Sequence, residues 1–231
     1  MKTINVIQHT SADYLGLLED HLEGRKIGFS YCRPFAEGAT LPRLSDVKDG
    51  IMFLGGGPWG TAGVRDIPSL KKEIELCRHC LLANKIIIGI GAGAQILAIA
   101  AGGASVASPL EFTTGIGSRV QGDALNGYLD ASFPYVLYGR DWPVPPDYAQ
   151  VLAIDETGRT LAFQLGETAF GFVFHPGMKL AMAEDLIMEF DEIPTETAPQ
   201  LLNLQNMKRE IEDNLVRFMT GLIQKTGLMR H

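Results

Sequence analysis

The sequence has little of what disulfide-bonded, secreted or membrane-spanning proteins require. It holds 3 cysteines in 231 residues, too few for the disulfide framework of a small secreted protein. Glycines and Gln95 interrupt its longest apolar run well before the ~20 residues that a membrane-spanning helix needs. The first residues lack a long apolar stretch followed by a small-residue cleavage site, so we expect a cytoplasmic protein with no membrane partner.

Basic residues are also scarce. The chain has 20 Lys and Arg against 27 Asp and Glu, and its formal net charge is -7. This balance argues against nucleic acid or an anionic membrane as a partner. Disorder is excluded as well, because 46% of the residues are hydrophobic and only 20% are charged. We predict a single domain over residues 1–231.

Two of the cysteines, Cys77 and Cys80, form a C-x-x-C motif. Redox pairs of this kind normally occupy the first turn of a helix that follows a strand. Here the motif lies inside residues 70–83, whose pattern predicts an amphipathic helix. We therefore predict a structural role for both thiols, and the sequence indicates neither a metal site nor a cofactor.

Apolar segments of strand-like and helix-like pattern alternate along the first half of the chain. Strands are predicted at 3–8, 26–31, 49–54 and 85–90, and helices at 12–22, 69–83 and 92–101. This alternation predicts an α/β fold with a doubly wound, mostly parallel sheet. Between residues 103 and 174 the apolar segments are short and separated by turns, which predicts a small antiparallel insertion.

A long helix is predicted near the C-terminus, over residues 201–226, after a Pro- and Thr-rich linker at 193–199. Apolar side chains recur there at helical spacing, with charged side chains opposite them. The apolar stripe consists of Leu204, Met207, Ile211, Leu215, Met219 and Ile223.

Two predicted strands end in glycine-rich loops, at 55–58 and at 89–93. Ligand sites of parallel sheets lie at such carboxyl ends. The second loop has two interpretations. In the first, G-I-G-A-G-A at 89–94 is the dinucleotide fingerprint G-x-G-x-x-(G/A), with Glu111 as the acid about 20 residues later. That interpretation predicts a nucleotide-binding oxidoreductase.

In the second interpretation the loop is a nucleophile elbow without its nucleophile. G-I-G-A-G-A-Q-I-L-A at 89–98, followed by the glycine pair at 102–103, resembles the G-I-C-L-G-(H/A)-Q-L-L-A…G-G elbow of class I glutamine amidotransferases. F-L-G-G-G-P at 53–58 resembles the G-G-P loop of that family. Three further stretches are similar to the GMP-synthase-like stand-alone branch, in the family's order: Y-G-R-D-W-P-V-P at 138–145, A-F-Q-L-G at 162–166 and G-F-V-F-H-P-G-M at 171–178.

The resemblance implies the flavodoxin-like architecture of the class I amidotransferases and a role for particular positions. Gly91 stands where the family has its nucleophilic cysteine, and Gly177 stands where it has the glutamate of the triad. His175 matches the catalytic histidine, although a histidine without those partners can equally hydrogen-bond a backbone carbonyl at a strand end. If the two positions are merely vacated, Gly91→Cys together with Gly177→Glu should rebuild the triad.

The resemblance also implies a ligand-binding backbone. Gly56 and Gly57 belong to the loop that supplies one oxyanion donor, and Ala92 matches the residue that supplies the other. Gln95 matches the residue that contacts the substrate glutamine, but a polar residue at a helix start is as commonly a capping or packing element. Unpaired N–H groups of this kind suit a carboxylate, an oxyanion or another small anion.

Amide hydrolysis by this route needs a thiolate, a base and a carboxylate that orients the base. Only His175 remains, so the leading hypothesis is a family member without glutaminase activity. It would bind a glutamine-like small molecule carrying a carboxylate or amide, or act as a regulatory or partner component of a synthetase or another protein. The alternative is an active amidotransferase or γ-glutamyl amide hydrolase with a rearranged site, for which Cys32 is the substitute thiol to consider.

Overall fold

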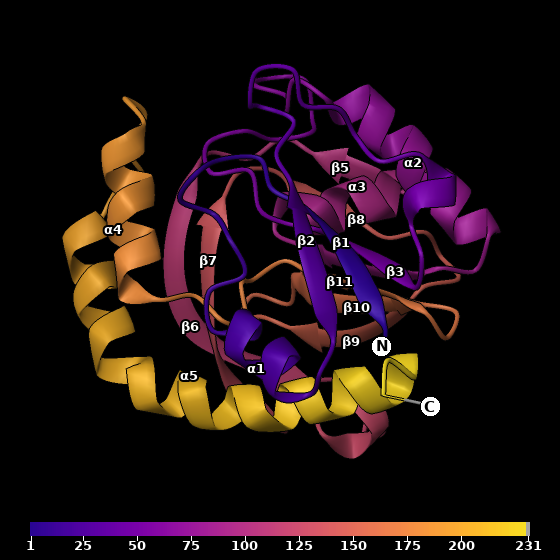
Figure 1. Cartoon of the computed structure of the whole chain (residues 1–231). Coiled ribbons are helices and arrows are strands. Elements are labelled where there is room, and N and C mark those ends of the chain that lie inside the picture. The colour runs from indigo at the N-terminus through magenta and orange to yellow at the C-terminus, as the bar shows by residue number, and fades with distance from the viewer. Residues whose placement is uncertain (230–231) are drawn as a thin grey trace.

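The computed structural model describes residues 1–229, which form one large sheet with helices packed on it (Figure 1). The helices are α1 (Leu18–Gly24), α2 (Leu70–Leu82), α3 (Ala92–Ala100), α4 (Leu180–Glu189) and α5 (Thr197–Thr226). The strands are β1 (Thr3–Ile7), β2 (Gly28–Cys32), β3 (Gly50–Phe53), β4 (Ile86–Ile90), β5 (Ala104–Val106), β6 (Glu111–Arg119), β7 (Ser132–Gly139), β8 (Trp142–Val144), β9 (Gln150–Ile154), β10 (Thr160–Leu165) and β11 (Ala169–Phe172). Single 3-10 turns lie at Leu44–Asp46 and Ala124–Gly127.

The large sheet joins a parallel and an antiparallel half. Its strand order is β2-β1-β3-β4-β11-β10-β9-β6-β7, and the pairs from β2 to β11 are parallel. From β11 onward the pairs are antiparallel, because β10 and β11 form a hairpin that turns the chain back beside the central strands. The α/β prediction is confirmed. The antiparallel strands predicted between residues 103 and 174 are present as well. Most of them extend the large sheet instead of forming a small separate insertion, and the sheet is not an obvious doubly wound arrangement.

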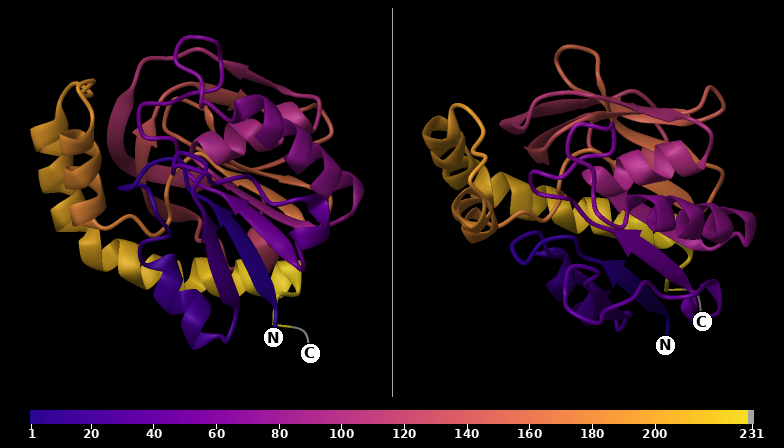
Figure 2. Two further views of the ribbon diagram at one scale, coloured as in Figure 1. Left: turned by 45° about the horizontal axis from the view of Figure 1, so that its top comes forward. Right: turned by 90° about the horizontal axis from the view of Figure 1, so that it is seen from above.

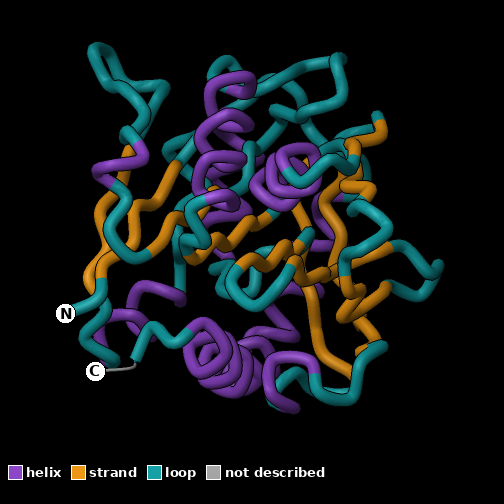
Figure 3. Tube along the Cα trace, turned by 90° about the vertical axis from the view of Figure 1, so that its right-hand side faces the viewer, coloured by secondary structure: helices purple, strands orange, loops and turns teal. Residues whose placement is uncertain are grey.

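The centre of the sheet is apolar on both faces. Every residue of β4 and β11 is buried, as the unbroken apolar run of β4 predicts for a strand covered on both sides. One face packs on α1 and α5, and the other packs on α2 and α3. Figure 3 shows the strands between these two groups of helices. The carboxyl ends of β1, β3 and β4 therefore meet at one edge, where both glycine-rich loops lie.

The long C-terminal helix begins at Thr197, four residues before the predicted start. Pro199 lies in its first turn, where a backbone N–H has no helical acceptor to bond, so the predicted linker is partly helix. The predicted apolar stripe faces the body of the protein, and Leu204, Ile211 and Leu215 are buried. Figures 1 and 2 show α4 beside the first turns of α5 at one side of the molecule. Within the described chain, no helix has the length and apolar character to cross a bilayer.

The helix predicted over 12–22 was wrong in its first half, because α1 begins only at Leu18. Gly16 adopts a φ of +60°, and a Cβ there would lie 2.2 Å from the Gly177 carbonyl oxygen. Leu17 N–H also donates to that carbonyl at 2.9 Å. Contact with residues far along the chain thus holds 9–17 as a loop, here named the β1 loop, at the carboxyl end of β1.

The packing of α5 makes a direct prediction. Leu215→Ala removes a side chain that is 1% exposed, and it should lower the free energy of unfolding by about 2–5 kcal/mol. Urea denaturation of the full chain measures this change. The matched control is the neighbouring Val216→Ala, whose side chain is 52% exposed and which should cost less than about 0.5 kcal/mol. Equal losses for the two variants would contradict the observed orientation of the helix.

Candidate functional site

Gly91 forms the sharp turn between β4 and α3. Its φ of 56° and ψ of -119° are strained for any residue that carries a side chain, and glycine adopts them at no steric cost. A Cβ on Gly91 would lie 3.1 Å from the Gly55 Cα, and its other neighbour within 4 Å outside the adjoining residues is the Gly55 nitrogen. The turn has the backbone of a nucleophile elbow. The space in front of it, where a nucleophile would stand, is open.

The two glycine-rich loops touch at this point and present backbone donors. A Cβ on Gly56 would lie 3.3 Å from that of Ala92. Ala92 is the first residue of α3, so its N–H has no acceptor within the helix. Among residues 1–229 neither Ala92 N–H nor Gly57 N–H makes a backbone–backbone hydrogen bond outside the regular elements. The loop of Gly57 and the first residue of α3 therefore adjoin each other, and the Gly57 N–H faces the Asp13 carboxyl group.

His175 is buried, and both of its ring nitrogens are bonded within the fold. Nε2 lies 2.7 Å from the Tyr14 carbonyl oxygen, and Gly177 N–H donates to Nδ1 at 3.2 Å. Since Nδ1 accepts and Nε2 faces an acceptor, the neutral ring with its proton on Nε2 satisfies both contacts. Burial lowers the pKa of His175, although Asp13 and the Tyr14 carbonyl act in the other direction. The sequence left open whether His175 hydrogen-bonds a backbone carbonyl at a strand end, and the structure shows this bond to the Tyr14 carbonyl.

Main-chain atoms pack close to Gly177, the position where the resemblance implies a glutamate. A Cβ at this position would lie 3.0 Å from the Leu18 nitrogen and 3.2 Å from the Leu17 nitrogen. Backbone of the β1 loop and α1 fills the space beside Gly177, and backbone cannot move aside as a flexible side chain does. A glutamate at 177 would require this backbone to shift by a few tenths of an ångström, and the rebuilt triad of Gly91→Cys with Gly177→Glu stays a prediction.

The carboxyl group near His175 comes instead from Asp13 in the β1 loop. Asp13 Oδ1 lies 4.0 Å from His175 Nε2, and the residue is 2% exposed. Burial raises the pKa of Asp13, while His175, His9 and the Gly57 N–H oppose that shift. Sequence reasoning missed this residue because it placed 12–22 in a helix. The available signal was Gly16, an unfavourable residue inside a predicted helix.

A second buried histidine supports the loop after β3. His9 Nδ1 lies 2.9 Å from the Gly55 carbonyl oxygen, and its Nε2 lies 2.7 Å from a Glu73 carboxylate oxygen. Both nitrogens face acceptors, so only the doubly protonated ring can donate to both. Burial alone would lower the pKa of His9, but Glu73, the Gly55 carbonyl and Asp13 together raise it. His9 is therefore the charged histidine of the site and His175 the neutral one.

Gln95 makes its polar contacts within the protein. Its Nε2 donates to the carbonyl oxygens of Arg140 at 2.7 Å and Asp141 at 3.1 Å. Its Oε1 accepts a hydrogen bond from Thr61 Oγ1 at 2.7 Å. These contacts tie the elbow helix to the segment after β3 and to the turn after β7, which supports the packing interpretation of Gln95.

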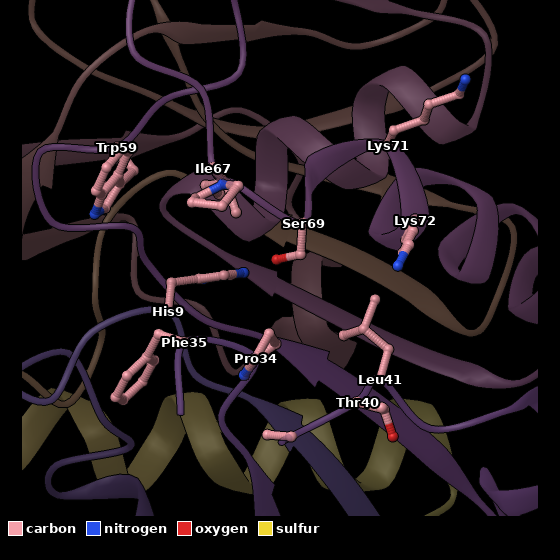
Figure 4. Close-up of a pocket in the computed structure, with 12 residues that line it drawn as sticks. His9, Pro34, Phe35, Thr40, Leu41, Trp59, Ile67, Ser69, Lys71 and Lys72 are labelled. Atoms are coloured by element: carbon pink, nitrogen blue, oxygen red, sulfur yellow. The ribbon is translucent and has the colours of Figure 1, made fainter. Parts of the chain in front are cut away.

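A pocket of about 440 Å³ lies beside His9 (Figure 4). Its lining comes from the end of β1, the loop after β2 and the segment that leads into α2. Phe35 and Trp59 give it aromatic walls, and Lys71 and Lys72 lie in the first turn of α2. Because His9 contacts both this pocket and Gly55, the pocket adjoins the glycine loops.

The cysteines do not supply a substitute nucleophile. Cys77 and Cys80 lie on the buried face of α2, and burial raises the pKa of both thiols. Cys32 ends the edge strand β2, and its Sγ lies 3.1 Å from the Thr40 carbonyl oxygen, with its pKa also raised by burial. Residues 1–229 contain no group of three His, Cys, Asp or Glu side chains suited to a metal ion.

Known proteins are similar to this chain in sequence and in fold. No family model matches the sequence. The glutamine amidotransferase-like protein YfeJ of Salmonella typhimurium is 26% identical over 190 residues, covering 80% of this chain and 79% of its own length. A glutamine amidotransferase from Thermotoga maritima superimposes with a TM-score of 0.81 at 21% identity, over 97% of this chain and 98% of its own.

In sequence and in fold, this chain is similar to glutamine amidotransferases. A GMP synthase component from Thermoplasma acidophilum also shares the fold, with a TM-score of 0.56 at 18% identity over 91% of this chain and 98% of its own. At these identities the solved structures establish the fold. The roles of Gly91, His175 and Asp13 must be argued from the geometry of this chain.

The strain at the elbow predicts the cost of restoring a nucleophile. Gly91→Cys should destabilise the protein by about 1–3 kcal/mol, because a side chain at φ 56° is strained and its Cβ crowds Gly55. The denaturant midpoint should fall with an unchanged slope. Gly122→Ala is the control, since a Cβ there meets no atom within 4 Å. A neutral or stabilising Gly91→Cys would show that the turn is not strained.

The ion pair of His9 and Glu73 predicts a pH dependence of stability. A raised pKa in the folded state means that the pair stabilises fully below about pH 6.5, the ordinary pKa of histidine, and that this contribution is lost as pH rises through the folded value. Glu73→Gln should be about 1.5–3 kcal/mol less stable than the native chain at low pH, with a smaller difference once the pH exceeds the raised pKa of His9.

Urea titrations of the native chain, Glu73→Gln and the control Glu75→Gln between pH 5.5 and 9 measure the difference in the free energy of unfolding. The exposed Glu75→Gln on the same helix is the matched control and should show no such trend. A difference for Glu73→Gln that grows with pH would contradict a charged His9.

Proposed function

We propose that this chain is a class I glutamine amidotransferase homologue that binds a small glutamine-like ligand without hydrolysing it. Gly91 carries the proposal, because a residue without a side chain stands at the turn where the family places its nucleophile. The Ala92 N–H remains as a donor for a carbonyl or carboxylate oxygen, and the Gly57 N–H on the adjoining loop faces the Asp13 carboxyl group. Such a protein acts as a binding or regulatory module rather than as a glutaminase.

The state of His175 supports this proposal. A general base for a thiol must be free to accept a proton at the nucleophile. Here Nδ1 accepts from Gly177 N–H and Nε2 faces the Tyr14 carbonyl, so both ring positions are used by the fold. A glutamate at 177 would also press against the Leu18 and Leu17 nitrogens, which lie 3.0 and 3.2 Å from its Cβ position. Each of the three triad positions thus differs from what hydrolysis through a thioester requires.

The two alternatives have less support. A rearranged glutaminase needs a thiol near His175, and the cysteines bond or pack elsewhere. A dinucleotide site needs an acid at the end of a strand next to β4. Glu111 begins β6 in the antiparallel half and lies 3.5 Å from Arg159. Its place in the sheet removes it from the elbow, and the nucleotide interpretation loses its defining acid.

A protein partner is part of the proposal. The GMP synthase component that shares this fold is by its name one part of a larger enzyme. A chain that binds glutamine without consuming it could report glutamine to a synthetase or another protein through the same face. The adjoining pocket of Phe35, Trp59, Lys71 and Lys72 gives that face both aromatic surface and positive charge.

An ammonia-release assay tests the proposed loss of hydrolysis. The full chain with L-glutamine or a γ-glutamyl amide should release no ammonia above a buffer control, since Gly91 provides no nucleophile. A turnover of even ~1 per second, low for an enzyme, would overturn the proposal. A glutamine-analogue alkylator followed by mass spectrometry should leave the native chain unmodified at the elbow and should label Gly91→Cys at residue 91.

A further inference from the structure

The cavity beside His9 lies where two connections of the parallel sheet separate. The strand order places β1 next to β3. The chain leaves β1 for α1 on one face of the sheet, and it leaves β3 for α2 on the opposite face. Connections that diverge in this way open a crevice beyond the carboxyl ends of the two strands, and open α/β sheets bind ligands in such crevices.

The cavity occupies this crevice. His9 follows β1 and Trp59 follows β3, and both residues line the cavity of about 440 Å³. A volume of this size is typical of sites for small molecules. All of the lining residues lie between positions 9 and 72 of the chain, so the cavity is separate from the turn at 89–94.

One end of the cavity is aromatic. Figure 4 shows Phe35 and Trp59 at the same end, on the side of His9 away from the lysines. The guanidinium group of Arg65 lies 4.7 Å from the centroid of the Trp59 ring, and it forms an ion pair with Glu192 at 2.8 Å. The indole ring is therefore held in place before a ligand arrives. Rings fixed beside a cavity provide a stacking surface for a planar base.

The other end of the cavity is positively charged. Lys72 and Thr40 lie there in Figure 4. Within residues 1–229 the lysines that form ion pairs are Lys2, Lys208 and Lys225, so Lys72 has no carboxylate partner in the fold. Lys72 is also the third residue of α2, where the helix dipole disfavours a positive charge. An anionic group in the cavity would supply the missing counter-charge.

We propose that this cavity binds a nucleoside monophosphate, with its base against Phe35 and Trp59 and its phosphate beside Lys72. Such a molecule carries a planar ring at one end and an anionic group at the other, as the two ends of the cavity require. The site is additional to the proposed glutamine-like ligand at the elbow. His9 connects the two places, because it lines the cavity and its Nδ1 lies 2.9 Å from the Gly55 carbonyl oxygen.

Calorimetric titration of the full chain with AMP, GMP, CMP and UMP tests this inference. The native chain should bind at least one of these nucleotides with a Kd below about 1 mM. That nucleotide should bind at least about tenfold more tightly than its own nucleoside or ribose 5-phosphate, because each of these lacks one of the two recognised groups. Binding of none of the nucleotides, or equal affinity for the nucleotide and its nucleoside, would overturn the inference.

Two variants separate the charge from the ring. Lys72→Gln should bring the affinities for the nucleotide and its nucleoside within about threefold of each other, since the phosphate loses its counter-charge. The matched control is Lys48→Gln, an exposed lysine at the amino end of β3, which should keep the native preference. Phe35→Leu retains apolar bulk but removes a ring, and it should weaken nucleotide binding at least about fivefold while leaving ribose 5-phosphate unaffected.

A preference for the nucleotide that survives Lys72→Gln, or nucleotide affinity that Phe35→Leu leaves unchanged, would contradict the proposed placement. If either variant fails to fold, the native chain supplies the test through the indole N–H resonance of Trp59. The bound nucleotide should shift that resonance, and an unmoved resonance at saturation would overturn the inference. These results are independent of glutamine binding and of ammonia release at the elbow.

Discussion

The contact between the β1 loop and the segment that carries His175 determines how each polar group near the elbow is used. His175 Nε2 bonds the Tyr14 carbonyl, and the Gly177 carbonyl receives the Leu17 N–H. The same packing requires glycine at 16, where a Cβ would lie 2.2 Å from the Gly177 carbonyl oxygen. It also brings the Leu18 and Leu17 nitrogens to 3.0 and 3.2 Å from the Cβ position of Gly177.

Three buried titratable groups, His9, Asp13 and His175, lie near this contact, and the number of hydrogen-bond acceptors around each histidine ring determines its charge. His9 faces two acceptors and is charged, whereas His175 accepts at one nitrogen and is neutral. Asp13 lies between these histidines with one oxygen unbonded. A buried carboxyl oxygen without a hydrogen bond is costly for folding.

Much of the architecture follows from local pattern in the sequence. The strand β4 is predictable because burial on both faces selects an unbroken apolar run. The apolar stripe of α5 is predictable because burial of one helical face selects apolar residues at helical spacing. Both patterns can be seen in a short stretch of sequence. The continuation of the sheet by β10, β9, β6 and β7 is not predictable in this way, since strand order depends on pairing between distant segments. Asp13 belongs to this second class. The leucines at 15, 17, 18 and 22 fit a helix, and only contact with Gly177, far along the chain, makes residues 9–17 a loop.

The positions of Gly91 and His175 were predictable because each lies in a motif whose backbone geometry is local, a strand end followed by a turn. Their chemistry was not, because it depends on the partners that the β1 loop supplies. A crystal structure of the native chain with L-glutamine tests the account most directly. The account predicts an intact glutamine in front of Gly91 with its amide oxygen on the Ala92 N–H. Glutamate formed in the site, or glutamine bound away from the elbow, would contradict it.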